Sequence, residues 1–227
     1  MTTARTAAAR SRPPGRAQAD SQGHAQAHAQ VHTHDHVHDH RPDPMRLTVF
    51  SPSGVSPDGT ALALALNRLR GLGFDARRDR AALARHQRFA GRDEVRLAAI
   101  HRVADEAPDV AMAVRGGYGL TRLLDGLDWK KLARSVERGT RWVGLSDFTA
   151  LQLGLLAHTG ARSWAGPCAL EGFGRDEADG GMDDVTADCF AEAMRGELEA
   201  VGFRTEAGFD GLSVRGTLWG GNLAMLC

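Results

Sequence analysis

The apolar run at residues 110–114, Val-Ala-Met-Ala-Val, constrains the fold more than any other stretch of this 227-residue chain. Five consecutive apolar residues between Pro108-Asp109 and Gly116 are typical of a strand that is buried on both faces. Such strands occur mainly in parallel sheets, because helices cover both faces of those sheets. The rest of the chain should therefore alternate strands with helices.

That alternation is present on both sides of the run. It predicts strands at residues 46–50, 74–77, 110–114 and 142–144, and helices from Asp58 to Gly71 and at 93–107, 120–137 and 147–158. Leu62, Leu66 and Leu69 recur at helical spacing, so they should form the buried face of the first helix. This order predicts an α/β fold with a doubly wound, flavodoxin-like or Rossmann-like parallel sheet.

The pattern is less regular after residue 160. Residues 163–167 resemble a strand end and turn, 183–195 an amphipathic helix, and 201–205 and 212–218 two alternating strands. An apolar helical start follows Gly220-Gly221 and stops at Cys227, and an apolar end of this kind usually packs against a partner. We therefore expect an α/β domain at 45–200, followed at 201–227 by a linker and the truncated start of a second, β-rich domain.

Residues 1–44 form a separate compositional block that holds seven of the ten histidines. With almost no large apolar side chains, this block cannot offset the entropy of folding, so we predict a disordered extension. Translation could equally start at Met1 or at Met45. The alternating imidazoles of the tract could chelate Zn, Ni or Cu, or could be a solvated tail that binds metal only adventitiously. The candidate ligands are His32, His34, His36, His38 and His40.

Composition excludes several classes of protein. The formal net charge is zero, so no overall field attracts nucleic acid, and no apolar run approaches the ~18 residues that span a bilayer. Cys168, Cys189 and Cys227 are too few and too scattered for a disulfide framework, which favours a reducing compartment. We therefore expect a cytoplasmic protein with no nucleic-acid or membrane partner.

A glycine-rich turn, Arg115-Gly-Gly-Tyr-Gly119, closes the central strand at the sheet edge where ligands bind in doubly wound folds. Three interpretations remain open. A dinucleotide site lacks the G-x-G-x-x-G spacing, and a plain structural turn needs no ligand. The third interpretation is a backbone cradle in which the N–H groups of Gly116 and Gly117 stabilise an oxyanion.

A second candidate is Ser146, which follows the apolar strand at 142–144 and precedes a helix. The serine could be a nucleophile at a strand-to-helix turn, or the N-cap of the helix that begins at Asp147. A nucleophile needs a base, yet His86, His101 and His158 each lie in an unsuitable context. Residue patterns alone leave the two roles evenly balanced.

Several motifs occur together in an order that resembles the LD-carboxypeptidases, the muramoyltetrapeptide carboxypeptidase family of serine peptidases. The resemblance begins at Leu47 and rests on Phe50-Ser-Pro-Ser-Gly54, Gln87-Arg-Phe-Ala-Gly91, Ala113-Val-Arg-Gly-Gly-Tyr-Gly119, Arg122-Leu-Leu124, Leu127-Asp-Trp129, Gly144-Leu-Ser-Asp-Phe-Thr-Ala-Leu151, Gly166-Pro167 and Gly216-Thr-Leu-Trp-Gly-Gly-Asn-Leu223.

The resemblance implies a cytoplasmic enzyme of peptidoglycan recycling that releases terminal D-alanine from murein tetrapeptides. It places the nucleophile at Ser146 and the oxyanion hole at the backbone N–H of Asp147 with that of Gly116 or Gly117. It implies no metal or organic cofactor, and a homodimer for the full-length protein.

The resemblance also implies what this chain lacks. In the family, the Glu and His that complete the triad follow the Gly-Gly-Asn-Leu segment, and this sequence stops at Cys227. We therefore expect a truncated family member with impaired catalysis. A non-catalytic or binding-only fragment, with a metal-binding tail, is the alternative.

Overall fold

The computed structural model describes residues 43–57, 59–198, 202, 208 and 211–226. These residues belong to a unit that spans Pro42–Cys227. The N-terminal extension was predicted to be disordered. Apart from Asp43 and Pro44, this extension and its histidine tract lie outside the described residues, so the prediction stays untested. Asp43 and Pro44 are both exposed and lie outside any helix or strand.

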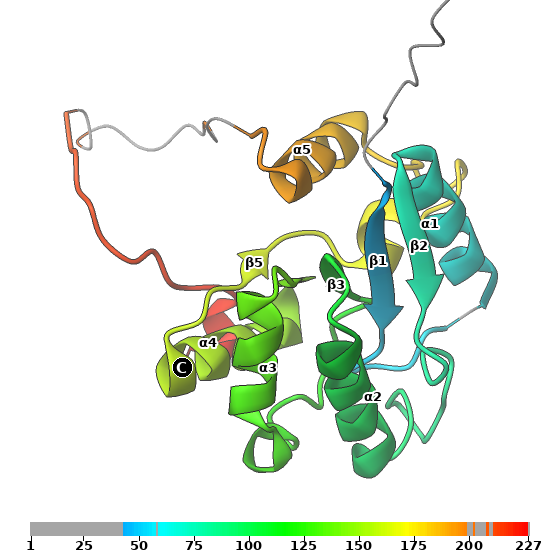
Figure 1. The fold of residues 1–227 in the computed structure, drawn as a ribbon. Coiled ribbons are helices and arrows are strands. Elements are labelled where there is room, and N and C mark those ends of the chain that lie inside the picture. The colour runs from blue at the N-terminus through cyan, green and yellow to red at the C-terminus, as the bar shows by residue number, and fades with distance from the viewer. Residues whose placement is uncertain (1–42, 58, 199–201, 203–207, 209–210, 227) are drawn as a thin grey trace, which may run out of the picture. The chain divides into compact units, whose positions relative to one another are not determined.

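Five parallel strands form the central sheet: β1 (Met45–Phe50), β2 (Phe74–Arg78), β3 (Val110–Ala113), β4 (Arg141–Gly144) and β5 (Trp164–Ala165). Their order is β2-β1-β3-β4-β5 (Figure 1). This is the strand order of flavodoxin-like folds, so the predicted fold class is confirmed.

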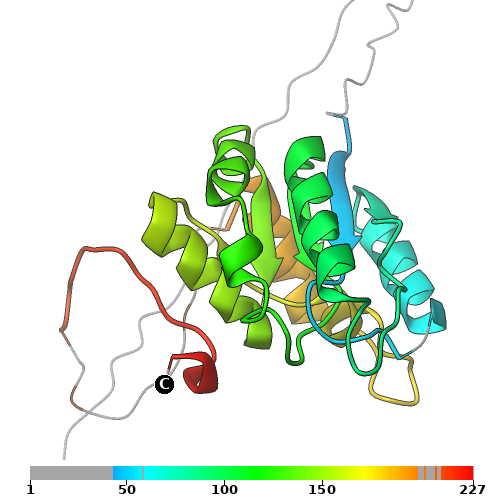
Figure 2. The ribbon, with the colours of Figure 1, turned by 90° about the horizontal axis from the view of Figure 1, so that it is seen from below.

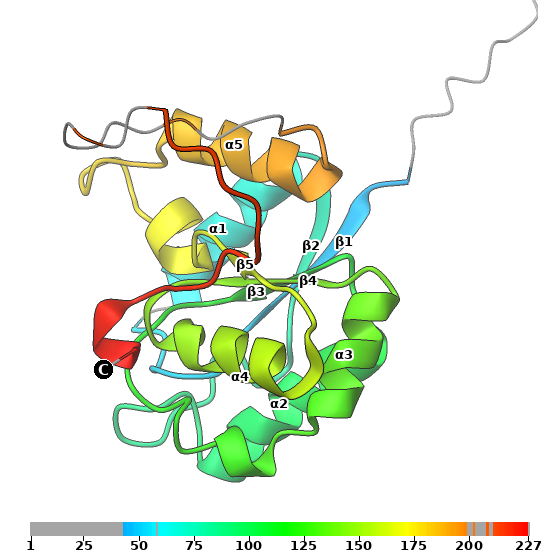
Figure 3. The same ribbon diagram turned by 90° about the vertical axis from the view of Figure 1, so that its left-hand side faces the viewer.

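Helices cover both faces of the sheet. They are α1 (Gly59–Gly71), α2 (Asp93–Glu106), α3 (Trp129–Glu137), α4 (Thr149–Thr159) and α5 (Asp184–Arg195). In Figure 3 the sheet is nearly edge-on, with α1 and α5 on one face and α2, α3 and α4 on the other. A single π-helical turn at Ala169–Phe173 packs on the α1 side.

Strand residues alternate between two apolar cores. Val110, Met112 and Val114 point into the core on the α1 side, whereas Ala111 and Ala113 point into the core on the α2 side. All five side chains are fully buried. The sequence therefore reads as a continuous apolar run because both faces of this central strand are covered.

The segment at 120–137, which was predicted to be filled by helical patterns, is divided in the structure. A loop and a 3₁₀ turn at Leu124–Gly126 precede α3, which begins only at Trp129. Asp128 caps α3 by accepting a hydrogen bond from the Lys131 N–H at 2.9 Å. Asp128 therefore marks the start of α3.

The prediction of a strand at 212–218 is wrong for this structure. These residues pair with no described strand, and Leu212, Val214 and Leu218 are largely exposed. Alternation alone does not make a strand, because a strand needs a neighbour for its backbone hydrogen bonds. Most of the strand predicted at 201–205 lies outside the described residues. The apolar end forms one 3₁₀ turn, Leu223–Met225.

Candidate active site

The candidate site lies at the carboxyl edge of the sheet, which Figure 2 views from below. The chain leaves β1 towards α1 on one face and leaves β3 towards α3 on the opposite face. The crevice between β1 and β3 is therefore the topological switch point, where doubly wound folds bind ligands. The loops after β1, β3 and β4 all meet at this edge.

Ser146 occupies a sharp turn between β4 and the 3₁₀ turn Ser146–Phe148. Its φ angle is 61°, in the left-handed region that non-glycine residues rarely adopt, and its side chain is exposed. The helix-cap alternative is wrong. Leu145 occupies the N-cap position of the 3₁₀ turn, and Phe148 that of α4. Neither position has a side-chain capping hydrogen bond.

Gly116 packs directly against the side chain of Ser146. A Cβ atom placed on Gly116 would lie 2.8 Å from Ser146 Cβ and 3.1 Å from its Oγ, so no larger residue fits without displacement. The Gly116 carbonyl accepts a hydrogen bond from the Gly54 N–H at 3.2 Å. Gly117 has φ 111°, and a Cβ atom placed on it would lie 3.2 Å from Gly54 Cα. The structure thus brings the glycine turn and the serine together.

Three backbone N–H groups lie in the two turns that form this contact. Within the described part of the chain, the N–H groups of Gly116, Gly117 and Asp147 donate no hydrogen bond. The first N–H groups of a helical turn lack intrahelical partners by geometry, which explains Asp147. Such donors, placed beside a serine, can stabilise negative charge on an oxygen.

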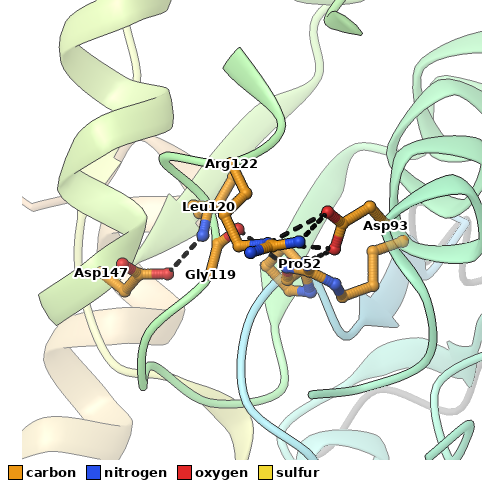
Figure 4. A network of polar contacts seen from close by, with 7 residues as sticks. Pro52, Asp93, Gly119, Leu120, Arg122 and Asp147 are labelled. Carbon is orange, nitrogen blue, oxygen red and sulfur yellow. Dashed lines mark hydrogen bonds and ion pairs between the residues drawn. The ribbon is translucent and has the colours of Figure 1, made fainter. Parts of the chain in front are cut away.

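The side chain of Asp147 has a role that the sequence did not indicate. Asp147 is 3% exposed, and its Oδ2 accepts a hydrogen bond from the Leu120 N–H at 2.9 Å. Oδ1 is buried without a partner among the described residues. A carboxylate therefore joins the turn that holds Ser146 to the glycine loop, as Figure 4 shows.

Sequence reasoning also missed Arg96, a fully buried cation on α2. Its Nη1 donates to the carbonyls of Pro52 at 2.8 Å and Gly119 at 2.9 Å. Its Nη2 pairs with Asp93 at 2.5 Å. The only available signal was an arginine on the apolar side of a helix, close to Ile100 and Val103.

Asp93 forms a second ion pair with an arginine that lies outside the core. The Arg122 guanidinium donates to its Oδ2 at 2.7 Å, as Figure 4 also shows. The hydrogen bond from Arg122, helped by Arg96, holds the pKa of Asp93 below its ordinary value, although desolvation opposes this shift. Asp93 therefore stays ionised beside the buried guanidinium.

None of the candidate histidine bases contacts Ser146. His101 lies on α2, where its Nε2 accepts a hydrogen bond from the Asp128 N–H at 3.0 Å. His158 stacks on Trp129 at a ring separation of 4.8 Å. His86 pairs through its backbone with Phe89. The described residues therefore supply no histidine base to Ser146.

The described residues contain neither a metal-binding cluster nor a membrane-spanning helix. They include no cluster of three or more His, Cys, Asp or Glu side chains that could hold a metal ion. The tract at His32–His40 lies outside them. No helix among them has both the length and the apolar character needed to cross a bilayer.

Comparison with known proteins adds relatives at the level of sequence and fold. The chain is 35% identical over 109 residues to a murein tetrapeptide carboxypeptidase of Pseudomonas aeruginosa, a match that covers 47% of this chain and 34% of that protein. A crystal structure of muramoyltetrapeptide carboxypeptidase from Oxalobacter formigenes aligns with a TM-score of 0.57 at 36% identity, over 65% of this chain and 47% of the other.

Microcin C7 self-immunity protein, in complex with aspartyl sulfamoyl adenosine, aligns with a TM-score of 0.61. It covers 67% of this chain and 45% of the other, but at 20% identity it supports only the fold. For three of the curated relatives, the match covers between 34% and 40% of the relative's own length.

The family profile of the LD-carboxypeptidase N-terminal domain matches residues 47–166, which include all five strands except the first two residues of β1. The matched region holds the serine turn, the glycine loop and the buried arginine described above. The chain belongs to the LD-carboxypeptidase family.

Proposed function

We propose that this chain carries the nucleophile domain of a serine-type LD-carboxypeptidase that releases terminal D-alanine from murein tetrapeptides in peptidoglycan recycling. The observation that carries the proposal is the contact between Ser146 and Gly116 at the switch-point edge of the sheet. A serine held in a left-handed turn, exposed and flanked by free backbone N–H groups, is arranged as a nucleophile beside an oxyanion hole.

In the proposed reaction, Ser146 Oγ attacks the carbonyl carbon between the L-configured centre and D-alanine. A base takes the hydroxyl proton as the C–O bond forms, and returns it to the amine of D-alanine as the C–N bond breaks. Water then hydrolyses the acyl-enzyme and restores the serine. The N–H of Asp147, with that of Gly116 or Gly117, stabilises the oxyanion in both steps.

The base belongs to a part of the enzyme beyond the described residues. The family resemblance assigns it to a His, oriented by a Glu, in the second domain that follows Gly220-Gly221-Asn222. We place the enzyme in the cytoplasm, where peptidoglycan fragments are recycled, and expect a homodimer for the full-length protein. The described residues alone should bind substrate far better than they turn it over, because removing triad members costs several orders of magnitude in rate.

The test measures D-alanine release from a purified muropeptide with a tetrapeptide stem. The chain alone should release no more D-alanine than its Ser146→Ala variant. A chimera that joins residues 43–222 to the second domain of the Oxalobacter enzyme should release D-alanine at least about a thousandfold faster than the same chimera with Ser146→Ala. A substrate that ends in L-alanine controls for stereochemistry.

Three results would contradict the proposal in different ways. Release that persists in the Ser146→Ala chimera would exclude this serine as the nucleophile. A chimera that melts cooperatively but binds muropeptide without turnover would favour the binding-only alternative. Ser146-dependent turnover by the chain alone would show that the base lies within this chain, and would contradict its assignment to a second domain.

A further inference from the structure

We infer that Arg96 and Asp147 are positioning residues that hold the glycine loop against Ser146. Their side chains form hydrogen bonds with the two ends of a single peptide group, Gly119–Leu120. The inference rests on the proposed function, because it assigns these two side chains to the oxyanion hole. Neither side chain would touch the substrate through this contact.

This arrangement follows from the order of the hydrogen bonds. The Gly119 carbonyl accepts from Arg96 Nη1 at 2.9 Å, and the Leu120 N–H donates to Asp147 Oδ2 at 2.9 Å. The carbonyl of residue 119 and the N–H of residue 120 belong to the same planar peptide unit. A cation therefore lies at the oxygen of one peptide and an anion at its hydrogen (Figure 4). Each charge polarises the peptide so that the other bond strengthens.

Because both side chains are buried, breaking these hydrogen bonds would leave charged groups without partners. The side chain of Arg96 is 0% exposed and Asp147 is 3% exposed. A buried charge is tolerated only where partners compensate it. Arg96 has a direct ion pair with Asp93, but Asp147 forms no ion pair within the described part of the chain. The Gly119–Leu120 peptide thus links the Asp147 carboxylate to a buried cation through two hydrogen bonds.

A glycine makes this link possible. Gly119 has φ 144°, and a Cβ atom there would lie 2.7 Å from Arg96 Nη1. Any side chain would therefore push the guanidinium away from the carbonyl. The Gly-Gly-x-Gly pattern thus serves two different contacts, since Gly116 accommodates Ser146 and Gly119 accommodates Arg96.

The same guanidinium extends this arrangement to a third loop. Arg96 Nη1 also donates to the Pro52 carbonyl at 2.8 Å, in the loop after β1. That loop holds Gly54, whose N–H donates to the Gly116 carbonyl at 3.2 Å. The loops after β1, β3 and β4 are therefore joined by Arg96 and Asp147. The position of the Gly116 and Gly117 N–H groups relative to Ser146 depends on both charges.

Hydrogen exchange at two backbone amides can test whether Arg96 and Asp147 act together. In each test, the amide that is measured forms no hydrogen bond with the side chain that is mutated. Leu120 N–H is bonded to Asp147, so its hydrogen exchange tests Arg96. Gly54 N–H is bonded to Gly116, so its exchange tests Asp147. We expect Arg96→Met to accelerate exchange at Leu120, and Asp147→Asn to accelerate it at Gly54, each by about tenfold or more, while amides of β1 and α1 stay protected. The experiment uses the full chain and site-resolved amide exchange.

Arg96→Lys provides a milder variant in case Arg96→Met fails to fold. It keeps the charge but cannot donate to two carbonyls and Asp93 at once, because an ammonium lacks the planar fork of donors. We expect an intermediate acceleration at Leu120. The matched control is Arg102→Lys, since Arg102 also lies on α2 and forms a partly buried two-bond contact with Asp79. This control should leave exchange at Leu120 and Gly54 unchanged.

A catalytic measurement separates this inference from the proposed function. In the chimera described above, Arg96→Lys and Asp147→Asn should lower kcat by about tenfold or more with KM little changed, because an oxyanion hole acts mainly in the transition state. Unchanged exchange at Leu120 in both Arg96 variants, or equal acceleration across the whole sheet, would overturn the inference. An inactive parent chimera would contradict the proposed function, and the exchange results would still decide the positioning role.

Discussion

Ser146 is one of three described non-glycine residues with a positive φ angle. A left-handed conformation in a non-glycine residue costs on the order of 1–3 kcal/mol and persists only where the surroundings impose it. Here β4 and the turn Ser146–Phe148 impose it, and Phe148 packs so closely on Gly144 that a Cβ atom there would lie 2.6 Å away. The strain holds the hydroxyl at the exposed tip of the turn.

This strain leads to a stability prediction. Ser146→Gly should be more stable to urea than Ser146→Ala by about 1 kcal/mol, because glycine adopts a positive φ without a Cβ clash. Both variants lose the hydroxyl, so the comparison isolates the backbone. Equal unfolding midpoints for the two variants would show that the turn is not strained.

The contact between Gly116 and Ser146 predicts a second effect. Gly116→Ala should destabilise the protein by about 1–3 kcal/mol, since the new methyl group would overlap the serine side chain. The control is Gly71→Ala, because Gly71 ends α1 with no atom within 4 Å of the new Cβ. Urea unfolding should show a change within about 1 kcal/mol for this control. A Gly116→Ala protein as stable as wild type would contradict the observed packing.

Cysteine reactivity is a third property of single residues. Burial raises the pKa of the Cys168 thiol to about 11, whereas Cys189 is exposed on α5. Only on the order of one Cys168 thiol in a thousand would be ionised at pH 8, and thiolates are the reactive form. Iodoacetamide followed by peptide mass spectrometry should therefore label Cys189 and spare Cys168 until the protein is unfolded. Equal labelling in the folded state would contradict this burial.

At the scale of elements, the junction between α2 and α3 depends on a neutral histidine. Burial, with a smaller contribution from Lys131, lowers the pKa of His101, and its Nε2 accepts the Asp128 N–H. Protonation would remove this acceptor at the start of α3. Because the folded-state pKa lies below the ordinary 6.5, the contribution to stability is complete above that pH and is lost as the pH falls through the lowered pKa.

The corresponding experiment compares melting temperatures of wild type and His101→Gln at pH 8 and pH 5. Glutamine can accept the same hydrogen bond but does not titrate. Wild type should therefore lose more stability than the variant between the two pH values. A parallel loss in both proteins would assign the acid sensitivity to other groups.

At the scale of the whole molecule, large apolar side chains gather on the segment after residue 211. Leu212 is 69% exposed, Val214 90% and Leu218 98%. Exposed apolar side chains that are clustered along one segment promote association. The segment also approaches the site, because the Asn222 N–H donates to Thr149 Oγ1 at 3.0 Å.

We expect the purified chain to self-associate in proportion to its concentration. Replacing Leu212, Val214 and Leu218 with Ser, Thr and Ser should reduce this association in sedimentation velocity. Val185→Thr is the control, since Val185 is as exposed as Leu212 but lies on α5, outside this segment. A monomeric wild-type chain at high concentration would refute the prediction.

The sequence predicted the elements whose signals are local. Residues 110–114 showed burial on both faces, and the leucines of α1 showed their apolar stripe, because these patterns depend only on the side that each residue faces. The family resemblance was confirmed for the same reason, since its motifs are short and ordered along the chain. The strand predicted at 212–218 failed because pairing with a neighbour cannot be read from one segment.

The candidate site also has features that the sequence predicted and features that only the structure revealed. The sequence by itself determined that a serine and a glycine turn follow two buried strands, which parallel pairing would bring to one edge of the sheet. It left Ser146 balanced between cap and nucleophile, and it gave no role to Arg96 or to the side chain of Asp147. Only the tertiary structure supplied the geometry on which the proposed roles rest, because a φ angle, a Cβ contact at 2.8 Å and a peptide hydrogen-bonded at both ends to buried side chains arise from loops that are distant in sequence.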